Sequence, residues 1–142
     1  MAYTSLAQMT DRFGLRMLVA LTDRAYPGTG VVDTAVVNRA LADTDAMIDG
    51  YLAVRYALPL ASTPVLLVDL AEMIAIWKLH VAAPDPKIEA DYKEAIRTLS
   101  GISKGDIRLS VAGVEPVTPG GTGVRVTDRE RPMTAENLKG FI

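Results

Sequence analysis

The chain has 142 residues, of which 49% are apolar, 6% aromatic and 23% charged, and it carries a formal net charge of −2. The absence of cysteine excludes a disulfide framework, a thiolate zinc site and a cysteine nucleophile. A single histidine excludes the usual metal sites built on two or three histidines, and the slight acidity leaves no basic surplus for nucleic acid. These exclusions argue against a self-contained enzyme and predict neither a cofactor nor a metal.

The sequence predicts no targeting segment and no membrane span. The opening MAYTSLAQMTDRFG lacks the basic start of a secretory signal. The most apolar stretch, residues 64–81, contains Asp69, Glu72, Lys78 and His80, which makes it too polar to cross a bilayer. We therefore expect a soluble, cytoplasmic protein of about one domain in length.

Two short helices are predicted on either side of Gly14, the first capped by Thr4 or Ser5 and the second reaching Thr22. A proline and two glycines then predict a loop over residues 24–30. The glycines of this loop lack the lysine and the strand–loop–helix setting of a phosphate-binding loop, so plain turns are the favoured interpretation. The triplet Thr-Asp-Arg, which occurs three times, is interpreted as local capping or ion pairing.

A longer amphipathic helix is predicted to begin at Asp33, a good N-cap, and to end before Pro59. Its polar face carries Asp43, Asp45 and Asp49. Asp45 and Asp49 are four residues apart and could together hold a hard cation, but a solvated polar face is the favoured interpretation.

The next helix, residues 64–81, is predicted to be capped by Thr63 with Pro64 in its first turn. It is apolar on nearly every side, and a helix of this kind is buried on every side. Two accounts stay open, a fully intramolecular core or burial partly against another subunit. His80, at its end, is interpreted as a helix-end or interface residue. The candidate subunit-interface residues are Leu67, Leu70, Ile74 and Trp77.

A last helix is predicted from the N-cap Asp85 to a glycine-marked end at residues 101–105, with Glu89 and Lys93 as an exposed pair. We therefore divide the chain into a helical domain, residues 1–106, and an arm, residues 107–142.

The arm is rich in glycine and proline and shows no helical period until its last ten residues. Ile107–Val111 and Val124–Val126 could form short strands, which are marginal without further strands. We expect an extended arm that is ordered by a partner. Its candidate partner-binding residues are the basic cluster Arg125, Arg129 and Arg131, and the apolar anchors Leu138 and Phe141.

Several stretches together carry a family resemblance: the opening with RFG and LTDR, then VVDTAVVNRALADTDAMIDGYLAVRYALPL, AIRTLSGISKGDIRL and RERPMTAENLKGF. They resemble the small protein encoded among the head genes of Mu-like phages and prophages, whose members are similar to the head–tail connector (adaptor) proteins of tailed phages. The loop after Asp23 departs from the family, because Tyr26-Pro27 replaces a more acidic turn, and no cation site is carried over to it.

The resemblance implies an all-α fold of four or five helices that assembles as a ring, expected to be a dodecamer, on the portal. The protein would then bridge the DNA-filled head and the tail-completion proteins in the neck of the virion, after assembly in the host cytoplasm. It would contact the passing DNA at most non-specifically. In this account a neighbouring subunit covers part of the apolar helix, and the arm docks on a neighbour or on the portal.

A second hypothesis from a different class is a small helical DNA-binding or regulatory module of a prophage, with the two short N-terminal helices as a helix-turn-helix. It predicts salt-sensitive binding to duplex DNA, which the charge balance disfavours. An enzyme is a distant third, because no serine–histidine–acid set can be assembled from these residues.

Overall fold

The structure, a computed structural model, describes residues 1–111, which form five α-helices and no strand. They are α1 (Leu6–Phe13), α2 (Leu15–Thr22), α3 (Thr34–Leu52), α4 (Val65–Leu79) and α5 (Pro86–Lys104). The all-α prediction is thus confirmed. The strand that Ile107–Val111 could have formed is not present, because no other strand lies among these residues to pair with it. Val124–Val126 lies outside the described residues.

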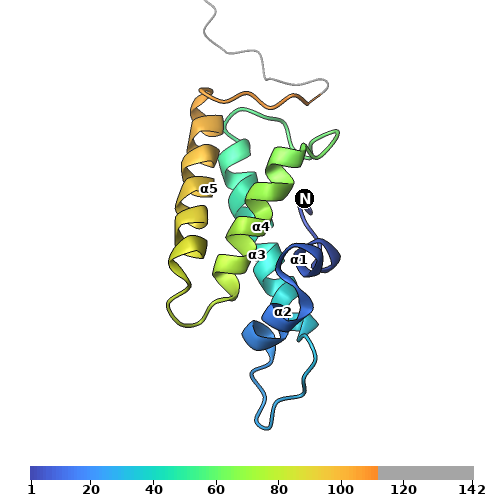
Figure 1. Ribbon diagram of the computed structural model, residues 1–142. Helices are drawn as coiled ribbons and strands as arrows, with labels where there is room; N and C mark the ends of the chain where they lie inside the picture. Colours follow the sequence, from blue (N-terminus) through green and yellow to red (C-terminus); the bar gives the residue numbers. More distant parts are fainter. Residues whose placement is uncertain (112–142) are drawn as a thin grey trace, which may run out of the picture.

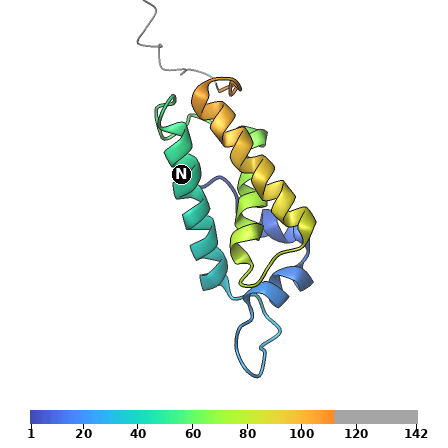
Figure 2. The ribbon, with the colours of Figure 1, turned by 90° about the vertical axis from the view of Figure 1, so that its left-hand side faces the viewer.

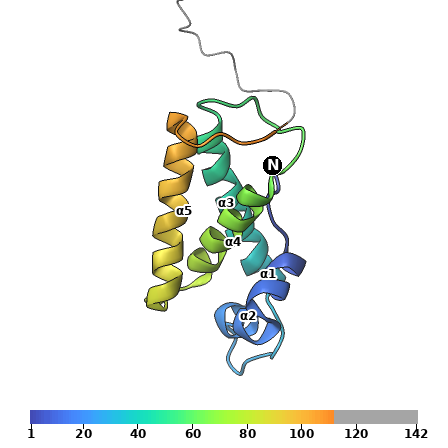
Figure 3. The same cartoon turned by 45° about the horizontal axis from the view of Figure 1, so that its top comes forward.

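Helices α3, α4 and α5 run side by side with alternating directions, and each of them contacts the other two (Figures 1 and 3). The short helices α1 and α2 pack against the part of this bundle where α3 begins, and the loop between α2 and α3 projects beyond it (Figure 1). For orientation, the end where α3 begins and α4 ends is called the loop end, and the opposite one the arm end.

The core is divided along the bundle into two clusters. Towards the arm end, Ile48, Leu52, Leu67, Leu99 and other buried side chains of α3, α4 and α5 form one cluster. Towards the loop end, α1 and α2 join α3 and α4 in a second cluster that includes Met9, which is fully buried. The two short helices therefore belong to the same folded unit as the bundle.

The predicted helix starts are confirmed at three positions. The side chains of Ser5, Asp33 and Asp85 each accept a hydrogen bond from a backbone N–H in the first turn of α1, α3 and α5. Gly14, with a φ of 86°, separates α1 from α2, and Gly105, with a φ of 90°, ends α5 in the left-handed conformation.

Two predicted boundaries are corrected. Helix α3 ends at Leu52 rather than near Pro59, because the chain turns there and buries Tyr56, which is 4% exposed. Its N–H still reaches the Leu52 carbonyl at 2.8 Å. Helix α4 is not capped by Thr63, because Pro64 is itself the N-cap residue with an extended ψ of 144°, and no side chain caps this helix.

The candidate interface residues on α4 are also corrected. Leu67 and Ile74 are fully buried and Leu70 is 3% exposed within the single chain, because α3 and α5 both pack against α4. The intramolecular core is therefore the right account for these three side chains. Trp77 is half-buried and stacks on Tyr92 of α5, with ring centroids 4.0 Å apart and planes inclined by 10°.

The first residues of the predicted arm pack on the bundle. Residues 105–111 cross the arm end (Figure 1). There Leu109 is 7% exposed and its N–H donates to the Tyr56 phenol oxygen at 3.1 Å. The Ile107 side chain lies against Gly101, where an added Cβ would be 3.1 Å from it. Residues 107–111 therefore contribute to the core of the helical domain.

Candidate interaction site

The N-terminal segment binds the carboxylates of Asp45 and Asp49, for which the sequence pattern indicated a cation or solvent as the partner. The terminal amine of Met1 contacts Asp49 at 3.0 Å, the Tyr3 phenol donates to Asp49 at 2.5 Å, and the Tyr3 N–H donates to Asp45 at 3.0 Å. This segment runs beside α3 (Figure 2). Both interpretations of Asp45 and Asp49 are therefore corrected, since the two carboxylates hold the chain's own N-terminus. Asp43 is exposed, as expected.

These contacts change the acid–base properties of two groups. Burial, reinforced by the hydrogen bond to Asp49, raises the pKa of Tyr3 well above its ordinary value. Burial likewise raises the pKa of Asp45, although the bond from the Tyr3 N–H opposes that shift. The N-terminal segment is thus an integral part of the folded domain.

Arg12 joins α1 to α4. Its guanidinium contacts Asp69 at 2.5 Å and Glu72 at 2.8 Å. Glu72 is 8% exposed, and Thr4 also lies against its carboxylate at 3.5 Å. The arginine of the first Thr-Asp-Arg triplet therefore forms ion pairs, as predicted, but across the fold rather than locally.

The loop between α2 and α3 is built around the second triplet. The Asp23 carboxylate accepts hydrogen bonds from the Gly30 N–H at 2.7 Å and from the Thr29 hydroxyl at 3.1 Å. The bond from Gly30, with the further bonds in this loop, lowers the pKa of Asp23 below its usual range. Thr22 closes the base of the loop, because its hydroxyl oxygen accepts from the Asp33 N–H at 3.1 Å.

This braced loop presents an aromatic side chain entirely to solvent. Tyr26, at the tip, is 101% exposed, and Val31 on the returning side is 65% exposed. Val81, 80% exposed, follows the C-terminus of α4 at the same end of the bundle. The loop end therefore carries exposed apolar side chains on a backbone that is already held in place.

The arm end carries a second exposed apolar set, which consists of Val54, Val65, Leu66 and Ile107. Val65 is 84% exposed at the start of α4, and Val54 is 68% exposed just after α3. The elongated bundle thus has apolar side chains in solvent at both of its ends.

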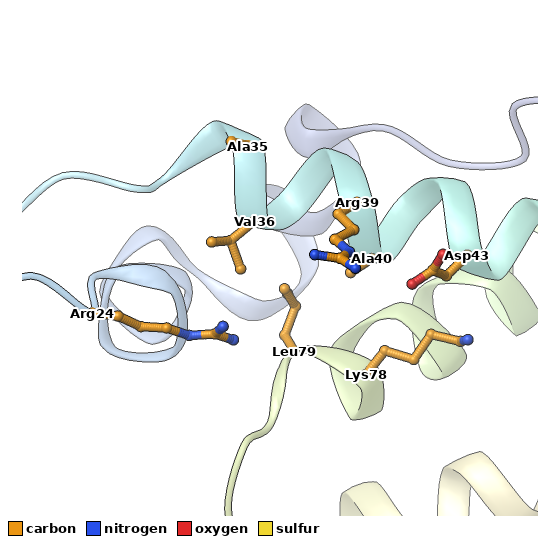
Figure 4. Close-up of a pocket in the computed structure, with 8 residues that line it drawn as sticks. All are labelled: Arg24, Ala35, Val36, Arg39, Ala40, Asp43, Lys78 and Leu79. Carbon is orange, nitrogen blue, oxygen red and sulfur yellow. The ribbon is translucent and has the colours of Figure 1, made fainter.

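A groove of about 450 Å³ lies on the side of the bundle near the loop end, between the loop, α3 and α4. Its floor is Val36, Ala40 and Leu79, and its rim carries three cations, Arg24, Arg39 and Lys78, and one carboxylate, Asp43. Arg24 and Arg39 lie on either side of Val36 and Leu79, whereas Lys78 and Asp43 lie towards the other end of the groove (Figure 4). Within residues 1–111, no ion pair or hydrogen bond engages any of these three cations.

His80 is a helix-end residue, in agreement with the sequence interpretation. It is the C-cap of α4, and its Nδ1 lies 2.8 Å from the Ile76 carbonyl oxygen. In the described part of the chain, no group of three or more histidine, aspartate or glutamate side chains could hold a metal ion. Nor is any helix of residues 1–111 long and apolar enough to cross a membrane.

The two short N-terminal helices do not form a helix-turn-helix. Gly14 alone connects them, whereas that motif has a turn of 3–4 residues. Their buried residues Met9 and Leu18 face the loop-end cluster, so the pair serves the core of the bundle.

The five predicted partner-binding residues, Arg125, Arg129, Arg131, Leu138 and Phe141, lie outside the described residues and stay predictions. The sequence predicted neither the exposure of Tyr26 nor the lack of partners for the groove cations within residues 1–111. The pattern Asp23–Tyr26–Gly30 contains a loop-bracing carboxylate and an aromatic tip, but exposure and convergence come only from the fold.

Comparison with known proteins gives three consistent findings. The family described as "Bacteriophage Mu, Gp36" matches residues 3–128. Gene product J of Escherichia phage Mu is 32% identical over 142 residues, covering 100% of both chains. The Mu-like prophage FluMu protein gp36 of Haemophilus influenzae is 27% identical over 140 residues, covering 99% of this chain and 98% of that protein.

Proposed function

The chain belongs to the bacteriophage Mu Gp36 family, and on this premise we propose that it is a structural head–tail connector (adaptor) protein. It forms an oligomeric ring between the portal and the tail. Its partners are further copies of itself, the portal protein and the tail-completion proteins, and its work is done by surfaces rather than by catalysis. It assembles in the host cytoplasm and ends in the neck of the virion, where passing DNA is contacted non-specifically at most.

The observation that carries this proposal is the fully exposed Tyr26 on a loop held by Asp23. When a partner covers a large aromatic side chain that was exposed to water, the free energy of the complex falls. Tyrosine is enriched among the residues that contribute most to the binding energy of protein interfaces. A loop already fixed by hydrogen bonds loses little conformational entropy on binding. Tyr26 is therefore suited to insert into a pocket of another protein.

The second exposed set, at the arm end, supports a bridging role. Val65 and Tyr26 belong to opposite ends of the bundle and cannot contact the same small surface. A subunit with an apolar contact surface at each end can hold one partner above it and another below. The neck of a phage places two different assemblies in this relationship.

A deletion of the gene in its phage or prophage, complemented with variants, tests the proposal. The wild-type gene should restore heads joined to tails, and electron microscopy of the purified protein with the portal protein of the same phage should show a ring on the portal. Tyr26→Ser should lose the joined particles, whereas Tyr26→Phe, the matched control, should retain them because it keeps the aromatic side chain. Complemented particles without any ring, or joined particles from Tyr26→Ser at wild-type numbers, would contradict the proposal.

The alternative, a small DNA-binding or regulatory module, is favoured by one observation, the groove with Arg24, Arg39 and Lys78. It predicts duplex binding that weakens steeply as salt rises. A titration of the full chain against duplex DNA at low and moderate salt distinguishes the two functions. Tight, salt-sensitive binding that Arg39→Glu abolishes would favour the module over the connector.

A further inference from the structure

We propose that the groove lined by Arg24, Arg39 and Lys78 is the receptor for residues 134–141 of a second copy of this chain. The inference rests on the proposed ring, because it names the contact that joins one subunit to the next. It assigns a binding site to Leu138 and Phe141, and it supplies a carboxylate for Arg24 and Arg39, which have no partner in the described fold.

The groove requires an occupant with a carboxylate next to apolar side chains. Arg24 and Arg39 lie on either side of Val36 and Leu79 (Figure 4), so an anion bound between the guanidiniums has apolar neighbours beside it. A phosphate of nucleic acid meets the charge requirement but leaves this floor uncovered. A peptide with an acidic residue and a nearby leucine or phenylalanine meets both.

The segment Thr134-Ala-Glu-Asn-Leu-Lys-Gly-Phe has this composition. Glu136 matches the guanidinium pair, Leu138 and Phe141 match the floor, and Lys139 matches Asp43 at the other end of the groove. Charge therefore agrees at Arg24, Arg39 and Asp43, and apolar character agrees along the floor.

The length of the connecting chain permits the contact. Residue 111 packs against the arm-end cluster, whereas the groove lies towards the loop end. Helix α5, with 19 residues, indicates a bundle length of about 28 Å. The 22 residues from 112 to 133 can span up to about 70 Å when extended. This reach exceeds the length of the bundle, so it allows the segment to extend beyond its own chain to a second copy.

A contact between the arm of one copy and the groove of another is heterologous, because the two surfaces differ. Repeated around an axis, heterologous contacts generate a closed ring, whereas an arm in its own groove generates no assembly. The proposed ring therefore favours the second copy as the source of the arm.

Cysteine cross-linking tests the contact in full-length chains, because the natural sequence contains no cysteine. One preparation carries Ala35→Cys at the exposed edge of the groove, and the other carries Asn137→Cys in the arm. The matched control replaces Ala35→Cys with Ala90→Cys, an equally exposed alanine in the first turns of α5. The mixtures are oxidised with copper phenanthroline, with and without the portal protein, and resolved on non-reducing gels.

The Ala35 and Asn137 variants should give a covalent dimer at least about tenfold faster than the control mixture. Arg39→Glu should reduce that rate about tenfold, and Glu136→Arg in the arm-bearing copy should restore it by reversing both charges. Arg97→Glu, on α5, should have no effect. Because mixed single-cysteine chains can be linked only between copies, no preference over the control in either condition would overturn the proposal.

Two further outcomes would also overturn it. A double variant with both cysteines that closes only within one chain would assign the arm to its own groove. An unchanged cross-linking rate in Arg39→Glu, together with loss of duplex DNA retention, would assign the groove to phosphate. A ring on the portal without the cross-link would refute this contact but leave the connector function standing, so the two failures are distinguishable.

Discussion

The backbone N–H of Leu109 donates a hydrogen bond to the phenol oxygen of Tyr56 at 3.1 Å, and both residues are buried at the arm end of the bundle. Tyr56 lies just beyond α3, and Leu109 lies beyond α5, so this bond joins two segments 53 residues apart. It satisfies a buried backbone donor that belongs to no helix. Residues 107–111 are therefore part of the folded bundle, and an arm that binds a partner would begin after residue 111.

Truncation at two positions tests this boundary. A chain ending at residue 111 should keep the stability of the bundle. A chain ending at residue 106 should lose roughly 2–4 kcal/mol, because the leucine buried at position 109 is removed and its site is left open. Urea unfolding followed by circular dichroism measures the difference. Equal midpoints for the two truncated chains would show that residues 107–111 do not stabilise the bundle.

The pair Tyr3 and Asp49 predicts a weakness in alkaline solution. Because the folded pKa of Tyr3 is raised above its ordinary value of 10.0, the folded state holds its proton more tightly than the unfolded state does. Stability is therefore complete below pH 10 and falls as the pH rises above it. Absorbance at alkaline pH should show one of the five tyrosines ionising only with unfolding.

Tyr3→Phe is the control for that experiment. It should remove the delayed ionisation and cost roughly 1.5–3 kcal/mol at neutral pH, since a buried hydrogen bond to a charged acceptor is lost. A variant with unchanged alkaline behaviour would show that another tyrosine is responsible.

The two carboxylates that hold Arg12 should contribute unequally. Glu72 is 8% exposed, so Glu72→Gln leaves its site with a weaker partner for the guanidinium and should cost on the order of 1–3 kcal/mol. The Asp69 side chain is 43% exposed, so Asp69→Asn should cost at most about 1 kcal/mol, because solvent screens the pair. Thermal unfolding of both variants measures the order, and a larger loss in Asp69→Asn would contradict it.

The loop that carries Tyr26 should loosen in acid. The pKa of Asp23 is lowered in the folded protein, so its contribution to stability is present above the ordinary value of 3.8 and is lost as the pH falls through the folded value. The amide signal of Gly30, which donates to this carboxylate, should shift in that range and exchange faster with solvent. NMR titration between about pH 2 and pH 5 measures both.

Asp23→Asn is the matched control, because it keeps the size of the side chain and removes the titration. In this variant the Gly30 amide should exchange at the faster rate at every pH. An unchanged exchange rate would show that the carboxylate does not brace the loop.

Local features of the fold were predictable where the physical cause is local. Ser5, Asp33 and Asp85 begin helices because a side-chain oxygen reaches a backbone N–H two or three residues away, and Gly14 ends α1 because it adopts a positive φ. The end of α3 was not predictable in this way. It depends on the burial of Tyr56 beneath a segment that follows α5.

The surfaces show the same division. The apolar sequence of α4 predicted that this helix is buried, but it did not say whether its own chain or another subunit covers it. The structure shows that neighbouring helices of the same chain bury Leu67 and Ile74. Asp45 and Asp49 could be placed on one face, but their partners are Met1 and Tyr3, more than 40 residues away.

By itself, the sequence determined the class of the fold, the starts of three helices and the family to which the chain belongs, because these depend on composition, on short-range hydrogen bonds and on residues matched along the chain. The tertiary structure alone decided which polar groups have hydrogen-bond or ion-pair partners and which side chains are exposed to solvent. Whether a side chain such as Tyr26 is exposed, or a cation such as Arg39 has no partner within residues 1–111, depends on segments that are distant in sequence and adjacent only after folding. The composition argued only against an enzyme, whereas the structure adds two surface features, the loop that carries Tyr26 and the groove lined by Arg24, Arg39 and Lys78.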